Sequence, residues 1–102
     1  MKNKLLQIID HYGIDKQLKY IHSEYFELDE AIIQFDWNDE IHNEKYAIEC
    51  VAQEIADVMV MLKQFQYYYG IEDKQIEDVM QYKIDRQLDR IEKENSNVSN
   101  RN

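Results

Sequence analysis

The near absence of helix-breaking residues constrains this chain more than any other feature, because its 102 residues include no proline and two glycines. Proline removes a backbone hydrogen bond from a helix and glycine weakens it, so their scarcity favours long uninterrupted helices. A hydrophobic share of 44% supplies enough apolar residues for such helices to pack on one another. The length is that of one small domain. The sequence therefore predicts an all-α protein.

The two glycines stand in a repeated phrase that divides the chain into helices. YGIDKQ covers residues 12–17, and YGIEDKQ covers residues 69–75. Glycine tolerates the left-handed conformation that ends many helices, and an aspartate that follows can cap the next helix. The polar segment DWNDEIHN adds one more break. These signals predict four helices, over residues 4–12, 16–35, 44–69 and 74–93.

Apolar residues recur at alternating steps of three and four along the second and third helices. Such stripes are the seams of helices packed at a shallow angle. We therefore expect a core made of Leu18, Ile21, Tyr25, Leu28, Ile32 and Phe35, with Ile48, Val51, Ile55, Val58, Leu62, Phe65 and Tyr69. The predicted fold is an antiparallel helical bundle of about four helices, in a single domain of residues 1–93. The polar end, residues 94–102, is predicted to be disordered.

Charge and cysteine usage exclude several function classes. The formal net charge is -9, with 21 acids against 12 Lys and Arg, and nucleic-acid binding relies on clustered cations. Cys50 is alone, so no internal disulfide forms, and no Cys/His spacing suggests zinc. The start lacks the features of a signal peptide, and no apolar run is long enough to span a membrane. We expect a soluble cytoplasmic protein without nucleic-acid or membrane partners.

Two pairs of acids flank the apolar stripes. Glu24 and Glu27 in the second helix, and Glu54 and Asp57 in the third, each come one residue before a stripe position. Residues three apart share a helix face, and antiparallel packing brings the two pairs to a similar distance from the connecting turn. Four converging carboxylates repel one another, and a hard divalent cation relieves that repulsion. The pattern predicts a Mg²⁺ site in which Mn²⁺ can substitute.

The same acids carry a resemblance to a known family. EYFELDEAI from Glu24, followed by EIADV from Glu54, is similar to the paired Glu-x-x-Glu and Glu-x-x-Asp motifs of MazG-like proteins. These belong to the all-α nucleoside triphosphate pyrophosphatase superfamily, and the resemblance spans roughly residues 16–92. It implies that Glu24, Glu27, Glu54 and Asp57 bind magnesium ions that engage nucleotide phosphates. It also implies a homodimer or homotetramer, in agreement with a third helix that is apolar on several sides.

Lys83 interrupts the apolar stripe of the predicted fourth helix, in the segment MQYKIDRQLDR. A lysine there can cover the core with its stem while its ammonium group stays in solvent. The other interpretation is phosphate binding. MazG-like proteins carry a lysine at the matching place, so the resemblance implies phosphate binding by Lys83, with Arg86 and Arg90 as weaker candidates. Gln87 stands where many relatives carry an asparagine.

The resemblance to MazG-like proteins implies a magnesium-dependent nucleotide pyrophosphohydrolase that cleaves a (deoxy)nucleoside triphosphate to the monophosphate and pyrophosphate. Glu24 and Glu27 are the candidate catalytic bases, because a carboxylate not engaged in coordination can accept a proton from water. The alternative is a non-catalytic helical oligomerisation or partner-binding protein whose acids form a solvated flank. A metal-binding fold without turnover lies between the two. Magnesium-dependent release of pyrophosphate discriminates among them.

Overall fold

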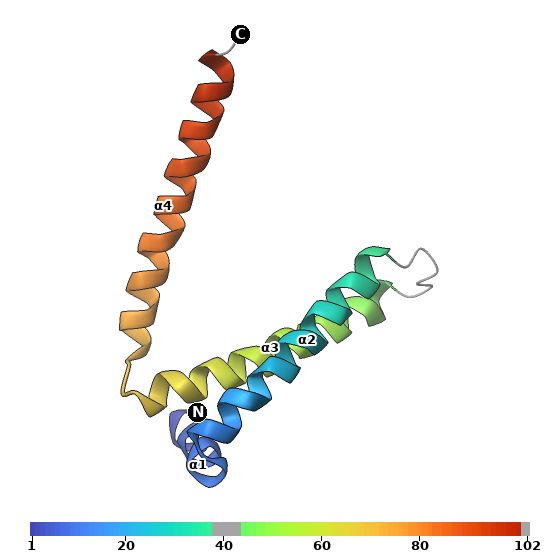
Figure 1. The fold of residues 1–102 in the computed structure, drawn as a ribbon, viewed down its shortest axis with the longest axis vertical. Helices are drawn as coiled ribbons and strands as arrows, with labels where there is room; N and C mark the ends of the chain where they lie inside the picture. Colours follow the sequence, from blue (N-terminus) through green and yellow to red (C-terminus); the bar gives the residue numbers. More distant parts are fainter. Residues whose placement is uncertain (38–43, 101–102) are drawn as a thin grey trace. The chain divides into compact units, whose positions relative to one another are not determined.

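In a computed structural model the chain forms four α-helices (Figure 1). The structure describes residues 1–37 and 44–100. The helices are α1 (Lys2–Tyr12), α2 (Ile14–Trp37), α3 (Glu44–Tyr68) and α4 (Asp73–Asn100). No strand occurs in the described ranges. The predicted all-α class with about four helices is confirmed, and the helix bounds lie within a few residues of the predicted ones except at the end of α4.

Both glycines interrupt the helices as predicted. Gly13 has a φ of 89° and Gly70 a φ of 71°, a region that favours glycine because it lacks a Cβ atom. The Gly13 N–H donates to the Ile9 carbonyl at 2.7 Å, and its own carbonyl accepts from the Gln17 N–H at 3.1 Å. A single residue therefore both ends α1 and starts α2, so the register between these two helices is tightly fixed.

By its internal contacts the chain divides into two units, Met1–Gly70 and Ile71–Asn102. In the first unit α2 and α3 lie side by side in opposite directions, and α1 packs on both, beside the first turns of α2 and the last turns of α3 (Figure 1). The second unit contains α4. The expected single domain of residues 1–93 stays a prediction. No helix in the described ranges combines the length and apolarity needed to cross a bilayer.

Helix α4 continues to Asn100, past its predicted end at Lys93. Residues 94–102 were expected to be disordered on account of their polar composition; residues 94–100 continue α4 in the structure, and disorder of this end stays a prediction. The segment contains neither proline nor glycine, so nothing in it stops helical hydrogen bonding once the preceding turns have formed. Residues 101 and 102 lie outside the described residues.

Helix α1 is held by apolar side chains that point into the first unit. Leu5 and Ile9 stand four residues apart, on one face of α1, and both are buried, Ile9 to 1% exposure. On α3, Val58, Met61 and Tyr67 are buried. The Lys2 and Lys63 ammonium groups lie 5.7 Å and 5.6 Å from the centre of the Tyr67 ring, within reach of cation–π attraction. The burial of Leu5 and Ile9 and the contact between Lys2 and Tyr67 hold α1 beside the first turns of α2 and the last turns of α3.

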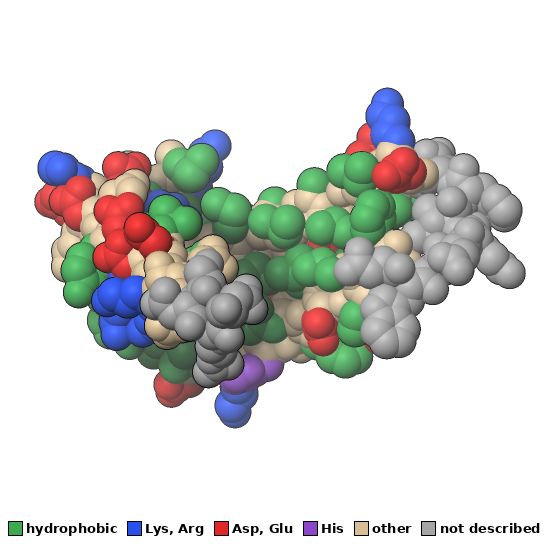
Figure 2. Space-filling model, turned by 90° about the horizontal axis from the view of Figure 1, so that it is seen from above, with side chains coloured by type: hydrophobic (Ala, Val, Ile, Leu, Met, Phe, Trp, Pro, Cys, Tyr) green, Lys and Arg blue, Asp and Glu red, His purple; other side chains and the backbone are tan. Residues whose placement is uncertain are grey.

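The predicted core stripes are only half correct. Every second member is exposed, with 41% to 66% of its surface accessible: Leu18, Tyr25, Ile32, Ile48, Ile55, Leu62 and Tyr69. The other members, which include Ile21, Val51 and Val58, are buried or half-buried. Apolar residues occupy a band wider than one helix contact, so their pattern alone does not locate the centre of the seam. Figure 2 shows hydrophobic side chains along the visible face of the α2–α3 pair, to the right of the view.

The seam between α2 and α3 lies about one residue N-terminal to its predicted position. On α2 the buried residues are Gln17, Ile21 and Glu24, at steps of four and three. On α3 a half-buried Glu54 precedes the buried Val58 by four residues. Glu24 and Glu54, which were expected on the flank of the seam, therefore belong to the seam itself, whereas Glu27 and Asp57 are exposed.

Candidate metal centre and adjoining pocket

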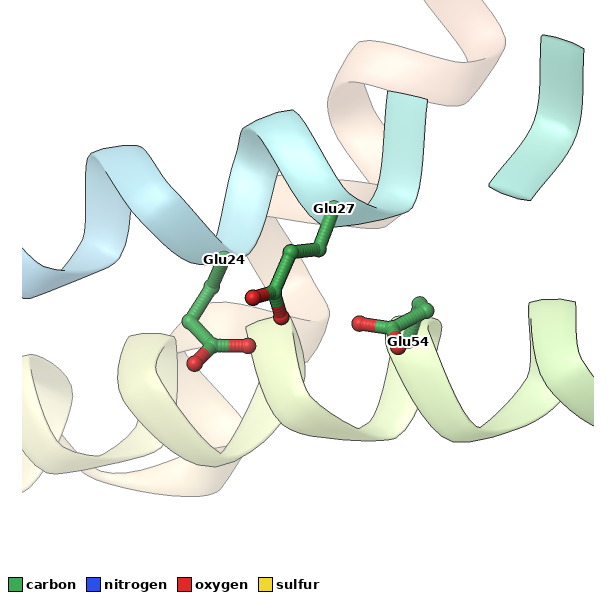
Figure 3. A group of neighbouring side chains, drawn as sticks. All are labelled: Glu24, Glu27 and Glu54. Carbon is green, nitrogen blue, oxygen red and sulfur yellow. The ribbon is translucent and has the colours of Figure 1, made fainter. Parts of the chain in front are cut away.

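Three acidic side chains from two helices converge within the α2–α3 seam. Glu24 and Glu27 extend from α2, and Glu54 extends from α3 to meet them (Figure 3). One carboxylate oxygen of each lies within 4.8 Å of the corresponding oxygens of the other two. The spacing of three residues puts Glu24 and Glu27 on one face of α2, and the antiparallel packing brings Glu54 opposite. Three of the four predicted metal ligands are thus brought together.

Two of these carboxylates have a buried oxygen without a hydrogen-bond partner. Glu24 is 6% exposed, and its Oε2 atom is unpaired, as is the Oε2 atom of Glu54. A buried acceptor without a donor costs free energy, and the cost is larger when the group is charged. The arrangement is therefore unfavourable by itself and indicates that a positively charged or hydrogen-donating ligand completes it.

The electrostatics of Glu54 and Tyr20 follow from this crowding. Burial raises the pKa of the Glu54 carboxyl, and the negative charges of Glu27, Asp57 and Glu24 raise it further. A hydrogen bond to the Glu24 carboxylate is the main cause that raises the pKa of the Tyr20 hydroxyl. The Tyr20 hydroxyl thus stays protonated and donates a hydrogen bond to the Glu24 carboxylate, one turn further along α2.

Asp57, the fourth predicted ligand, lies apart from the three converging oxygens. It is exposed, and with Glu24 it lines a pocket of about 390 Å³ that adjoins the carboxylates. The remaining lining residues come from α1, α2 and α3: Ile8, Tyr12, Lys16, Gln17, Tyr20, Val60, Met61 and Gln64. Coordination by Asp57 stays a prediction, although its charge reaches both Glu54 and Tyr20.

The cationic residues predicted to bind phosphate lie on α4. Lys83 and Arg86 are both exposed there, within the unit Ile71–Asn102. Their role in phosphate binding stays a prediction. Within the first unit a different cation, Lys16, lines the pocket, and its ammonium group lies 5.1 Å from the centre of the Tyr12 ring. Lys16 was not among the residues predicted to bind phosphate.

The donor set fits magnesium. Mg²⁺ binds oxygen ligands at about 2.0–2.1 Å in an octahedron, so its neighbouring oxygens lie about 3 Å apart and its opposite ones about 4 Å. Carboxylate oxygens within 4.8 Å of one another reach such spacings by small side-chain rotations. The two unpaired buried oxygens, on Glu24 and Glu54, supply the lone pairs that a hard cation requires. The described residues offer no nitrogen or sulfur ligand in this group, which disfavours zinc.

Because the pKa of Glu54 is raised, acidification should change two properties of the protein in opposite directions: it should stabilise the metal-free fold and weaken magnesium binding. A carboxyl whose pKa is higher in the folded state destabilises the fold when ionised, so acidification through that pKa relieves the metal-free protein. Magnesium needs the ionised carboxylate, so acidification weakens its binding. Between about pH 7 and pH 5, the melting temperature of Glu54→Gln in chelator should approach that of the wild type, and the wild-type response to magnesium should shrink. A difference in melting temperature between Glu54→Gln and the wild type that widens on acidification in chelator would contradict this prediction.

Three pocket residues that sequence reasoning missed share a simple relation to the acids. Tyr20 precedes Glu24 by four residues, Gln17 precedes it by seven, and Gln64 follows Asp57 by seven. Steps of four and seven return to the same helix face. A polar residue four or seven positions from one of these acids therefore indicates a pocket residue on the same helix face. The predicted apolar stripes obscured this signal, because they lie one residue away from the observed seam.

Comparison of the chain with protein-family models, with curated proteins and with solved structures returned no match.

Proposed function

We propose that this protein is a magnesium-dependent nucleotide pyrophosphohydrolase, which cleaves a (deoxy)nucleoside triphosphate to the nucleoside monophosphate and pyrophosphate. The observation that carries the proposal is the convergence of Glu24, Glu27 and Glu54, two of which keep a buried oxygen without a partner. This supports a cation site. The nucleotide substrate is supported by the resemblance of the two acidic motifs to those of MazG-like proteins.

The side chains divide the work according to their exposure. Glu24 and Glu54 have the buried oxygens and are assigned to hold the metal, with Asp57 as a further ligand from the pocket side. Glu27 is the exposed member of the three, so it can exchange protons with solvent. We assign it as the base that accepts a proton from the attacking water, with Glu24 as the other candidate. Bound Mg²⁺, or Mn²⁺ in its place, would neutralise phosphate charge and acidify that water.

Lys83 and Arg86 are assigned to the phosphates of the substrate. Their cationic side chains suit the negative charge that builds on a leaving pyrophosphate. Lysine offers a compact charge and arginine a planar pair of donors, so the two make different contacts with phosphate oxygens. The assignment rests on the sequence resemblance at Lys83.

A screen for pyrophosphate release tests the proposal directly. Each common ribo- and deoxyribonucleoside triphosphate is incubated with the protein in magnesium, in manganese and in chelator. At least one nucleotide should release pyrophosphate with either metal and none should do so in chelator. Glu30→Gln serves as the control, because it removes an exposed acid of α2 outside the cluster. A complete absence of metal-dependent release would favour the non-catalytic helical interaction protein instead.

The exposed apolar residues of α2 and α3 support self-association. Leu18, Tyr25 and Ile32 on α2 repeat every seven residues, as do Ile48, Ile55 and Leu62 on α3, and all are more than 40% exposed. Burying such a face against a second copy removes apolar surface from water, and two-fold pairing is the commonest arrangement. We expect a homodimer or homotetramer of the 12.4 kDa chain. Sedimentation equilibrium at micromolar concentrations should give at least twice that mass, and a persistent monomer would contradict the expectation.

A further inference from the structure

The pocket beside the carboxylates contains two buried glutamines that form one polar pair. Gln64 of α3 is 1% exposed and Gln17 of α2 is 5% exposed, although both are amides among mainly apolar neighbours. The Gln17 Nε2 atom donates to the Gln64 Oε1 atom at 2.8 Å. Glutamine is rarely buried so deeply unless its hydrogen bonds are met. The pair therefore spans the α2–α3 seam and forms part of the pocket lining.

The pair keeps hydrogen-bonding capacity beyond this single bond. The Gln64 Nε2 atom is 3.7 Å from the Met61 Sδ atom, and a thioether sulfur is a weak acceptor. Each carboxamide has two N–H donors and an oxygen with two lone pairs. The Gln17–Gln64 bond uses one donor and one lone pair, so both a donor and an acceptor remain for a ligand in the pocket.

The rest of the pocket suits a flat, largely apolar ring. Ile8, Val60 and Met61 supply aliphatic and thioether surface, and Tyr12 supplies an aromatic face. The volume of about 390 Å³ is at the lower end of the range for small-molecule sites. Glu24 belongs both to the pocket wall and to the carboxylate cluster. A ligand with phosphates at the cluster would thus have its other end beside the glutamines.

We infer that Gln17 and Gln64 are the specificity-determining residues of this protein, and that their amides read the hydrogen-bonding edge of a nucleobase held in the pocket. The inference rests on the proposed nucleotide function and adds to it the part of the substrate that the pocket recognises. A buried polar pair rejects a ligand that lacks the matching groups, because binding such a ligand leaves the amides unpaired. Phosphates alone, without a base, should therefore be poor substrates.

The test compares nucleoside triphosphates with ribose 5′-triphosphate, which has the phosphates and sugar without a base. The measured quantity is the ratio of kcat/KM for the best nucleotide to kcat/KM for ribose 5′-triphosphate. Gln64→Met and Gln17→Met keep side-chain volume and remove the amides, and each should lower that ratio about tenfold or more. Gln53→Met, at an exposed position on α3, is the matched control and should leave the ratio unchanged. Ratios unaltered in both pocket variants would overturn the inference.

A second measurement keeps the inference testable if the variants fail to fold or if the wild type hydrolyses nothing. Free nucleosides are titrated into the wild-type protein, and the side-chain amide NMR signals of its glutamines are followed. The Gln17 and Gln64 signals should shift saturably while the Gln53 signal stays in place. Absence of pyrophosphate release with such shifts present would count against the proposed hydrolysis alone. Unmoved Gln17 and Gln64 signals with every nucleoside would reject the base-reading pair.

Discussion

Glu24→Gln and Glu54→Gln should each abolish the stabilisation that the wild-type protein gains from magnesium. A ligand that binds only the folded state at ten times its Kd contributes about 1.4 kcal/mol, which corresponds to a rise in melting temperature of about 5–10 °C for a domain of this size. Both variants replace a carboxylate oxygen that is buried and unpaired. Magnesium-dependent turnover should fall with them by about a hundredfold or more, since the lost charge stabilisation acts in a desolvated site.

Without metal, Glu54→Gln should not destabilise the protein. In chelator, Glu54→Gln removes one of several mutually repelling charges and adds an N–H donor near the Glu24 and Glu27 carboxylates. Its melting temperature should therefore equal or exceed that of the wild type. Thermal scans in magnesium and in chelator measure both effects, and Glu30→Gln matches the change of charge. If magnesium raises the melting temperatures of both Glu24→Gln and Glu54→Gln as much as that of the wild type, the proposed metal centre is wrong.

Lys83→Met should lower kcat/KM for the preferred nucleotide by about tenfold or more, or about 1.4 kcal/mol of transition-state stabilisation. The methionine keeps most of the apolar stem and removes the ammonium charge, so the far-UV circular dichroism should not change. Steady-state kinetics with magnesium held in excess give the result. The variant separates phosphate binding from the alternative in which the Lys83 stem covers apolar surface.

Lys93→Met is the control for that substitution, because it removes a charge from an exposed position further along α4. It should leave kcat/KM within about twofold of the wild type, as expected for a solvated surface charge. Arg86→Gln tests the second cation and should have the smaller effect of the two phosphate-binding candidates. Equal kinetics in Lys83→Met and the wild type would assign Lys83 to the covering of apolar surface.

Sequence reasoning located the acids better than it located the core. The spacing predicted that the carboxylates of Glu24, Glu27, Glu54 and Asp57 converge, and those of the three glutamates do, because positions along a helix follow directly from its period. The stripes misplaced residues such as Tyr25 and Ile55, which are exposed. Both helices are apolar on two sides, and which side faces inward depends on the partner helix, information that one helix does not contain.

The pocket was beyond prediction for a related reason. Its walls come from three helices, and the contribution of α1 depends on the backbone turn at Gly13. The turn itself was predicted, but the direction in which α1 leaves it is set by the burial of Leu5 and Ile9 against the other helices. Gln17 and Gln64 stand 47 residues apart in sequence, and a polar residue in an apolar run gives no sign of its partner.

The position of Glu24 and Glu54 within the seam implies that the proposed function is retained at a cost in folding stability. Leucine at these two places would continue the apolar contacts of Ile21 and Val58 and would remove the two unpaired oxygens. Proteins commonly give up stability where a site requires charge, and a stabilised variant then loses its activity. Selection for heat resistance alone should therefore replace these two carboxylates, whereas selection for function should keep them.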